Sequence, residues 1–330
     1  MTIESAIRGL VMGDSLSTQN ATHRLALLSE RRIRRFNILQ SFATENRHTT
    51  IPEPYVHGFS PKYLYPRPSD DVEWFYWSRD IASRSLEFSE AWREMASSQD
   101  RLRVRVSVAS ALKNIASGMK APACGHDNPH YFDNSAMFRA LGVASAIPQK
   151  LKDVRSLIKE DSSHTNSEDG VWCAVAIGVL VVNIFSGHQV SQAIESALKE
   201  LPADSWSQRE VTRALEISKN EPRLKERVML LEEKFVDRIY PYPYSAPETL
   251  GLVVSHLQHE DEPYGLFTSM FLHRRNTDSL PGIIAFMLGL QHGSGWLPEM
   301  FRFGEVSLDG VSIPTLKGKY LMPPTDTVSN

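Results

Sequence analysis

The residues best suited to chemistry are acidic and lie just before two apolar segments with helical spacing. Ser69-Asp70-Asp71 precedes one such segment, and Asn276-Thr277-Asp278-Ser279 precedes another near the opposite end of the chain. These residue types are common helix caps, and acids in a first turn suit the helix dipole. Adjacent carboxylates also repel each other unless a cation lies between them. The pattern therefore predicts either two solvated caps or, if the two starts face each other, one Mg²⁺ site with oxygen ligands only.

A shorter pattern, Gly13-Asp14-Ser15-Leu16, resembles the nucleophile block of the GDSL esterases. In that chemistry Ser15 would attack an ester carbonyl and an Asp-x-x-His would supply the base. Asp127 to His130 and Asp161 to His164 both have this spacing. Such a serine follows a buried strand, however, whereas residues 3–12 have the periodicity of a helix. A serine esterase is therefore the weaker alternative.

The elements that must position these residues are helices, because apolar residues recur at helical spacing and strand-like alternation is scarce. Five prolines within residues 51–68 predict a long loop that leads to Ser69. The first helix is expected to stop at Gly13-Asp14. Helices are expected over residues 3–12, 25–42, 72–95, 103–115, 136–146, 150–159, 168–185, 190–200, 207–218, 224–236, 265–272 and 278–292, with another opening at Pro247. We therefore expect one all-α domain over residues 1–317, followed by a polar C-terminal tail at 318–330.

The composition excludes several classes of protein. Among 330 residues, 36 Lys and Arg stand against 39 Asp and Glu, and the net charge of −3 favours neither nucleic acid nor an anionic membrane as partner. Two cysteines cannot form a disulfide framework, which favours a reducing compartment. The N-terminus has no export signal, and the most apolar run, at 171–185, is shorter than the roughly 20 residues that cross a bilayer. We expect a cytoplasmic protein, and a monomer is compatible with the sequence.

Five short blocks in the same order give the chain a resemblance to the ADP-ribosylglycohydrolase family, which includes the dinitrogenase reductase-activating glycohydrolases. Residues 8–16 are similar to a helix ending in Gly-Asp-x-Leu, and residues 69–71 to Thr/Ser-Asp-Asp at a helix start. Residues 134–139 resemble Asn-Gly-x-x-x-Arg, and His164-Thr165 resembles a His-Thr pair before a long apolar helix. Residues 276–279 look like Asp-x-Asp-Thr/Ser before a helix that contains glycines.

The resemblance implies a compact orthogonal multi-helix domain with one or two Mg²⁺ ions between the two acidic helix starts. It implies that the metal ligands are Ser69, Asp70, Asp71, Asn276, Asp278 and Ser279, and that Asp70, Asp71 and Asp278 act in catalysis. It also implies that the distal ribose and diphosphate contact the backbone of Asn134, Ser135, Ala136 and Met137, and His164. The implied activity is Mg²⁺-dependent hydrolysis of the glycosidic bond between ADP-ribose, or a related ribosyl group, and a protein side chain or small molecule. Metal ions suit this task because they orient a diol and lower the pKa of water.

The chain departs from the family pattern at the site itself. Asn276 stands where the family usually has Asp, so one negative charge is missing although an amide oxygen remains. Val72 replaces a Thr after the acidic pair, and Ser135 replaces a Gly of the substrate loop. These changes keep a second hypothesis open: a catalytically silent member that binds ADP-ribose or a protein partner.

Three other clusters have simpler interpretations. The arginines at 31–35, and those at 101, 103 and 105, are interpreted as solvated surface. The aromatic residues at 74–77 are interpreted as core. Tyr240, Tyr242 and Tyr244 alternate with prolines in a loop, which makes an aromatic wall for a base more credible there.

Overall fold

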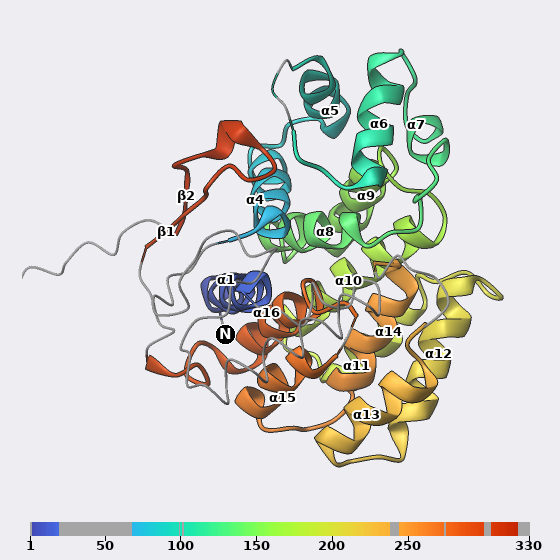
Figure 1. Ribbon diagram of the computed structural model, residues 1–330, viewed down its shortest axis with the longest axis vertical. Coiled ribbons are helices and arrows are strands. Elements are labelled where there is room, and N and C mark those ends of the chain that lie inside the picture. The colour runs from blue at the N-terminus through green and yellow to red at the C-terminus, as the bar shows by residue number, and fades with distance from the viewer. Residues whose placement is uncertain are drawn as a thin grey trace, which may run out of the picture.

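The computed structural model describes residues 2–19, 68–98, 100, 102–237, 244–273, 275–299 and 305–322, and these are almost entirely helical (Figure 1). In chain order the helices are α1 (Ile3–Gln19), α4 (Asp70–Ser83), α5 (Phe88–Ser97), α6 (Val106–Ala116), α7 (Ala123–His126), α8 (Ser135–Ala146), α9 (Leu151–Ser162), α10 (Asp169–Phe185), α11 (Val190–Leu198), α12 (Trp206–Lys219), α13 (Leu224–Lys234), α14 (Ala246–Leu257), α15 (Pro263–Ser269) and α16 (Leu280–His292). Short 3₁₀ turns lie at Met270–Leu272 and Pro314–Leu316. The described strands, β1 (Val306–Ser307) and β2 (Tyr320–Met322), pair antiparallel. The all-α prediction is confirmed.

Helix α10 forms the centre of the core. Its side chains are buried along nearly the whole length, as expected for a helix that is apolar on every face. It packs against α8, α9 and α11 and also touches α14 and α16. Among the described residues, no helix is long and apolar enough to span a membrane.

Helices α1 and α16 pack at very close range, which joins the two ends of the chain. A side chain on Gly9 would clash with the carbonyl oxygen of Ala285, and one on Gly13 would clash with the carbonyl of Pro281. The predicted stop at Gly13-Asp14 is wrong, since α1 continues to Gln19. Gly13 is a contact point between two helices and ends neither of them. The continued helix holds Asp14 on its buried side.

The acidic pair at 70–71 opens α4, whose other face packs on α8. Trp74 and Phe75 are buried, which confirms that the aromatic cluster belongs to the core. The predicted helix over 72–95 is two helices, because the chain turns after Ser83 and Ser85 adopts a positive φ of 54°. Helix α6 begins at Val106, so Arg105 is its N-cap residue and not part of its first turn.

The C-terminal segment is anchored to α4 by one buried carboxylate. Glu73 accepts backbone N–H bonds from Val311 at 2.6 Å, Ser312 at 2.8 Å and Ile313 at 2.9 Å. Strand β2 then pairs with β1, so the expectation of a tail is wrong for residues 318–322. The predicted helix at 25–42, the proline-rich loop at 51–67 and the tyrosines at 240 and 242 lie outside the described residues.

Candidate functional site

Three segments distant in sequence meet at the acidic helix starts. Asp14 of α1 accepts hydrogen bonds from the backbone N–H and the hydroxyl of Ser69, each at 2.5 Å. Ser69 in turn caps α4 by accepting the N–H of Asp71. Ser279, directly before α16, lies with its hydroxyl 3.5 Å from Asp71 Oδ2. The start of α4, the C-terminal part of α1 and the turn before α16 therefore form one cluster.

Arg105 places a guanidinium group inside this cluster. Its Nη2 lies 3.0 Å and 3.3 Å from the two carboxylate oxygens of Asp71, and 3.6 Å from Asp278 Oδ2. Its Nη1 donates to the side-chain oxygen of Asn134, and the guanidinium carbon lies 4.6 Å from the ring centre of Tyr244. The interpretation of Arg105 as solvated surface is wrong, because its side chain is only 12% exposed. Arg103 does lie on the surface.

Asn134 connects the acidic cluster to the start of α14 by hydrogen bonds. Its amide nitrogen donates to the hydroxyls of Thr249 at 3.0 Å and Ser279 at 3.1 Å, while its oxygen accepts from Arg105. The Thr249 hydroxyl lies 2.7 Å from the side-chain oxygen of Asn276. The amide of Asn276 donates to Glu248 at 2.6 Å. Asn276 has a φ of 60°, a left-handed conformation that asparagine tolerates better than most residues.

Burial and mutual repulsion raise the pKa values of three carboxyl groups here, those of Asp14, Asp70 and Asp71. Burial raises the pKa of Asp14 to about 8, although its bonds from Ser69 work in the opposite direction. Burial also raises the pKa of Asp70, and that of Asp71 more strongly, while Arg105 lowers both and Asp278 adds to the increase. Burial alone lowers the pKa of Arg105, but Asp71, Asp278 and Asp70 together raise it well above its ordinary value. The cluster therefore holds more carboxyl groups than its one permanent cation can neutralise, and burial favours their protonated forms while no other cation is bound.

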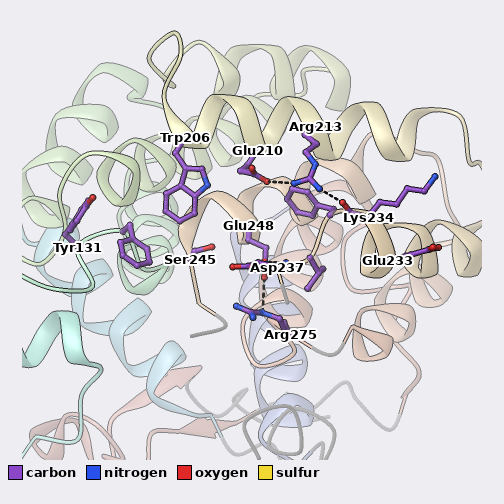
Figure 2. A pocket seen from close by; sticks show the side chains of 13 residues that line it. Tyr131, Trp206, Glu210, Arg213, Glu233, Lys234, Asp237, Ser245, Glu248 and Arg275 are labelled. Atoms are coloured by element: carbon purple, nitrogen blue, oxygen red, sulfur yellow. Dashed lines mark hydrogen bonds and ion pairs between the residues drawn. The ribbon is translucent and has the colours of Figure 1, made fainter. Parts of the chain in front are cut away.

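A cavity of about 580 Å³ is lined in part by Glu248, the residue that accepts the hydrogen bond from Asn276 (Figure 2). One side is aromatic, with Phe132 and Trp206 in edge contact at 5.4 Å. The other side carries Glu248 and Arg275, which lie 3.6 Å apart. Glu248 belongs both to the cavity wall and to the hydrogen-bond chain through Asn276, and burial raises the pKa of its carboxyl group to about 7. The volume falls within the roughly 300–1,000 Å³ of small-molecule sites.

The sequence profile of the ADP-ribosylglycohydrolases matches residues 3–306, nearly the whole chain. The chain belongs to the ADP-ribosylglycohydrolase family. No individual curated protein matches it. Membership confirms the resemblance and supports a hydrolase that acts on ADP-ribose linkages.

Because the ADP-ribosylglycohydrolases generally depend on metal, the donor chemistry of the cluster can be tested against Mg²⁺. Among the described residues, no three His, Cys, Asp or Glu side chains form a group that could hold a metal ion. Mg²⁺ is usually bound through only one or two carboxylates, with water and substrate oxygens completing its shell. Asp70 and Asp278 are the partly exposed members of the cluster, whereas Asp14 and Asp71 are buried. This pair of carboxyl groups, which supplies oxygen donors only, fits one hard divalent ion.

The full set of six metal ligands that the resemblance implied fits the structure less well, because three of the six side chains already have partners within the protein. The hydroxyl of Ser69 donates to Asp14, and that of Ser279 accepts from Asn134. Both polar atoms of the Asn276 side chain have partners within the protein, Thr249 and Glu248. The structure brings these three predicted ligands to the cluster, but their oxygen atoms serve to hold its parts together.

The predicted substrate contacts lie deeper than the acidic pair. Asn134 and Ser135 open α8, and the Ser135 N–H donates to Asp133 at 3.0 Å. Ala136 and Met137 are fully buried in the core, and the Met137 N–H donates to the carbonyl of Asn134. His164 is buried, with its Nδ1 2.9 Å from the Glu160 carbonyl and its ring stacked on Trp92. Contact of these residues with a ribose or diphosphate stays a prediction.

The esterase arrangement is not present among the described residues. Ser15 lies inside α1 and is 2% exposed, and no strand precedes it in the described part of the chain. Asp161, from one candidate Asp-x-x-His, accepts from Arg139 at 2.7 Å and from Trp92 at 3.0 Å. Asp161 is therefore part of a buried network that joins α5, α8 and α9.

Sequence reasoning missed Asp14, Arg105, Thr249 and Glu248. The Gly-Asp of the first block contained Asp14, and its position at the family motif was a usable signal. Arg105 is the last of three alternating arginines, at 101, 103 and 105, and no local feature of the sequence distinguishes it from the other two. Thr249 and Glu248 follow Pro247 at a helix start and look like ordinary first-turn residues.

Proposed function

We propose that this protein hydrolyses the glycosidic bond between the anomeric carbon of an ADP-ribosyl, or related ribosyl, group and a protein side chain or small molecule. The observation that supports it is the convergence of Asp70, Asp71 and Asp278 from the two acidic helix starts around Arg105. Family membership supports the reaction class, and the hydrogen bond from Asn276 to Glu248 of the 580 Å³ cavity supports the location.

In this proposal one Mg²⁺ ion is held by Asp70 and Asp278, the partly exposed carboxylates. When bound, such an ion supplies charge that orients ribose hydroxyls and lowers the pKa of a water molecule. The protein's own residues fix the geometry. Asn134 and Arg105 hold Asp71 and Ser279 in place, and Ser69 fixes α4 against Asp14.

The proposed reaction is a displacement at the anomeric carbon. Water forms the new C–O bond while a carboxylate of the cluster accepts its proton. The bond to the carrier breaks with its electron pair moving to the leaving nitrogen or oxygen, which then takes up the proton from that carboxyl group. Asp70 and Asp278 are assigned this role because they are the carboxylates that solvent reaches.

The cavity is proposed to receive the rest of the substrate. The rings of Phe132 and Trp206 suit stacking with an adenine base, and Arg275 offers positive charge to a diphosphate. Glu248 also lines the cavity, and its hydrogen bond from Asn276 links the cavity wall to the turn that carries Asp278. A ligand could therefore extend from the aromatic side of the cavity to the carboxylates.

The test is turnover of a panel of N-linked and O-linked ADP-ribosyl substrates in the presence of Mg²⁺. Asp70→Asn and Asp278→Asn should each lower kcat/KM by about 100-fold or more, the usual contribution of a positioned acid or base. Asp80→Asn is the matched control, because Asp80 lies on α4 with its side chain 43% exposed. Unchanged turnover in Asp70→Asn and Asp278→Asn would exclude this site.

The second candidate is a catalytically silent protein that binds ADP-ribose. The observation in its favour is Asn276, which lacks the charge of an aspartate and bonds to Thr249 and Glu248. Calorimetry with ADP-ribose distinguishes the two: binding by the native chain without turnover of any substrate in the panel would establish the silent protein.

A further inference from the structure

Arg105 lies where a cation has the strongest effect on the acidic cluster. It approaches Asp71 from the start of α4 at 3.0 Å and Asp278 from the turn before α16 at 3.6 Å. These two segments come from opposite ends of the chain and would otherwise bring like charges together. A guanidinium at this point links them through charge-assisted hydrogen bonds and an ion pair.

Two further partners, neither of them an aspartate, fix the position of Arg105. Asn134 accepts from Nη1, and the ring of Tyr244 faces the guanidinium at 4.6 Å. Its place directly before α6 sets the direction from which the side chain enters. Such a side chain is held in the cluster on several sides and does not behave as a mobile surface arginine.

A guanidinium and a divalent ion cannot both occupy the space between Asp71 and Asp278. They would also repel each other strongly at such short range in a buried site. We propose that Arg105 is a built-in cation that excludes one divalent ion from the acidic cluster. The inference rests on the proposed metal site. It states that Arg105 determines how many divalent ions this chain binds.

The test is the stoichiometry of Mn²⁺ binding, measured by electron paramagnetic resonance and calorimetry on the full chain without substrate. Mn²⁺ is the probe because it accepts the same oxygen ligands as Mg²⁺. Arg105→Gln should bind one more ion per chain than the native protein, because it removes the charge and opens the space. Arg105→Lys keeps the charge and should bind the native number.

Arg103→Gln is the matched control, since Arg103 is exposed two residues away and should leave the stoichiometry unchanged. Circular dichroism checks that each variant is folded. If Arg105→Gln is unstable without metal, Arg105→Met provides a second neutral variant. Refolding of either variant on addition of Mn²⁺, with one more ion bound than in the native protein, would also support the inference.

Equal stoichiometry in native and neutral variants would overturn the inference, as would an extra ion in Arg105→Lys. This outcome is separate from failure of the proposed function. Lack of turnover with any ADP-ribosyl substrate rejects the hydrolase, whereas the ion count is obtained without substrate and concerns Arg105 alone.

Discussion

Arg105 and Arg139 both carry positive charge inside the protein, and each is paired with aspartate. Arg105 joins the acidic cluster, whereas Arg139 holds the core beneath it. Arg139 is fully buried, with Nε 2.7 Å from Asp161 and Nη2 2.6 Å from the Thr165 hydroxyl. Its guanidinium also lies 5.1 Å from the Trp92 ring centre. One residue type thus serves two tasks, and only its surroundings distinguish them.

Replacing Arg139 with Met should strongly destabilise the fold. The change leaves Asp161 buried without its cation, and removing one partner of a buried pair costs about 3–5 kcal/mol. Urea unfolding monitored by circular dichroism measures the free energy of unfolding. Arg155→Ala is the control, because its pair with Glu200 is 41% and 18% exposed and such pairs contribute about 1 kcal/mol or less. Similar losses in the two variants would contradict the assigned role.

At the scale of elements, a close backbone contact between α1 and α16 positions Asp14. Gly9 and Gly13 on α1 and Gly289 on α16 let the two helix backbones approach at distances that leave no room for a Cβ atom. Each helix carries part of the acidic site or leads directly from it: Asp14 belongs to α1, and Asp278 and Ser279 precede α16. The glycines therefore determine how near the two parts of the site can lie.

The change Gly9→Ala should destabilise the protein although alanine is the better helix former. Its Cβ would overlap the backbone of Ala285, and overpacking costs about 1–3 kcal/mol, which exceeds the gain of about 1 kcal/mol in helix propensity. Thermal unfolding of Gly9→Ala and Gly295→Ala makes the comparison. No atom lies within 4 Å of a Cβ at Gly295, so that variant should unfold near the native temperature. A native-like Gly9→Ala protein would show that the helices can separate at no cost.

At the scale of the whole molecule, both ends of the described chain close on the same region. Helix α1 packs on α16, and Glu73 of α4 anchors residues 311–313. A second group of polar residues links α14, which carries His256, to α13, which carries Glu232. His256 Nε2 is 2.9 Å from His273 Nε2, and His273 Nδ1 is 2.8 Å from Glu232. Global stability therefore depends on pH through groups outside the acidic cluster.

Burial, together with His273, Arg227 and His259, lowers the pKa of His256 well below 6.5. The folded protein keeps this ring neutral, while the unfolded chain binds a proton below about pH 6.5. Its contribution to stability is thus fully present above that pH and falls by about 1.4 kcal/mol per unit as the pH decreases toward the folded pKa. His256→Gln should reduce this acid-side loss, as measured by urea unfolding between about pH 8 and about pH 5.5.

The informative quantity is the difference in the free energy of unfolding between His256→Gln and the native protein at each pH. Asp14 and Glu248 also titrate, and because their pKa values are raised, their contribution to stability falls as the pH rises. His188→Gln is the control, since His188 is exposed. A His256→Gln protein with the native pH profile would show that His256 does not contribute.

The sequence by itself determined the helices and the two acidic segments. Helical periodicity is a local property, so α8, α9, α10, α12 and α16 could be located within a few residues, and short ordered motifs identified the family. The pairing of Asp70-Asp71 with Asp278 could be proposed because each motif lies at a helix start.

Only the tertiary structure decided what lies between those carboxylates. Gly13 reads as a helix stop in sequence, but it is a contact between α1 and α16. Arg105 reads as surface, but it bridges Asp71 and Asp278. Both errors have one physical cause: steric clearance and charge neutralisation depend on residues that are distant in the chain, which no local pattern records.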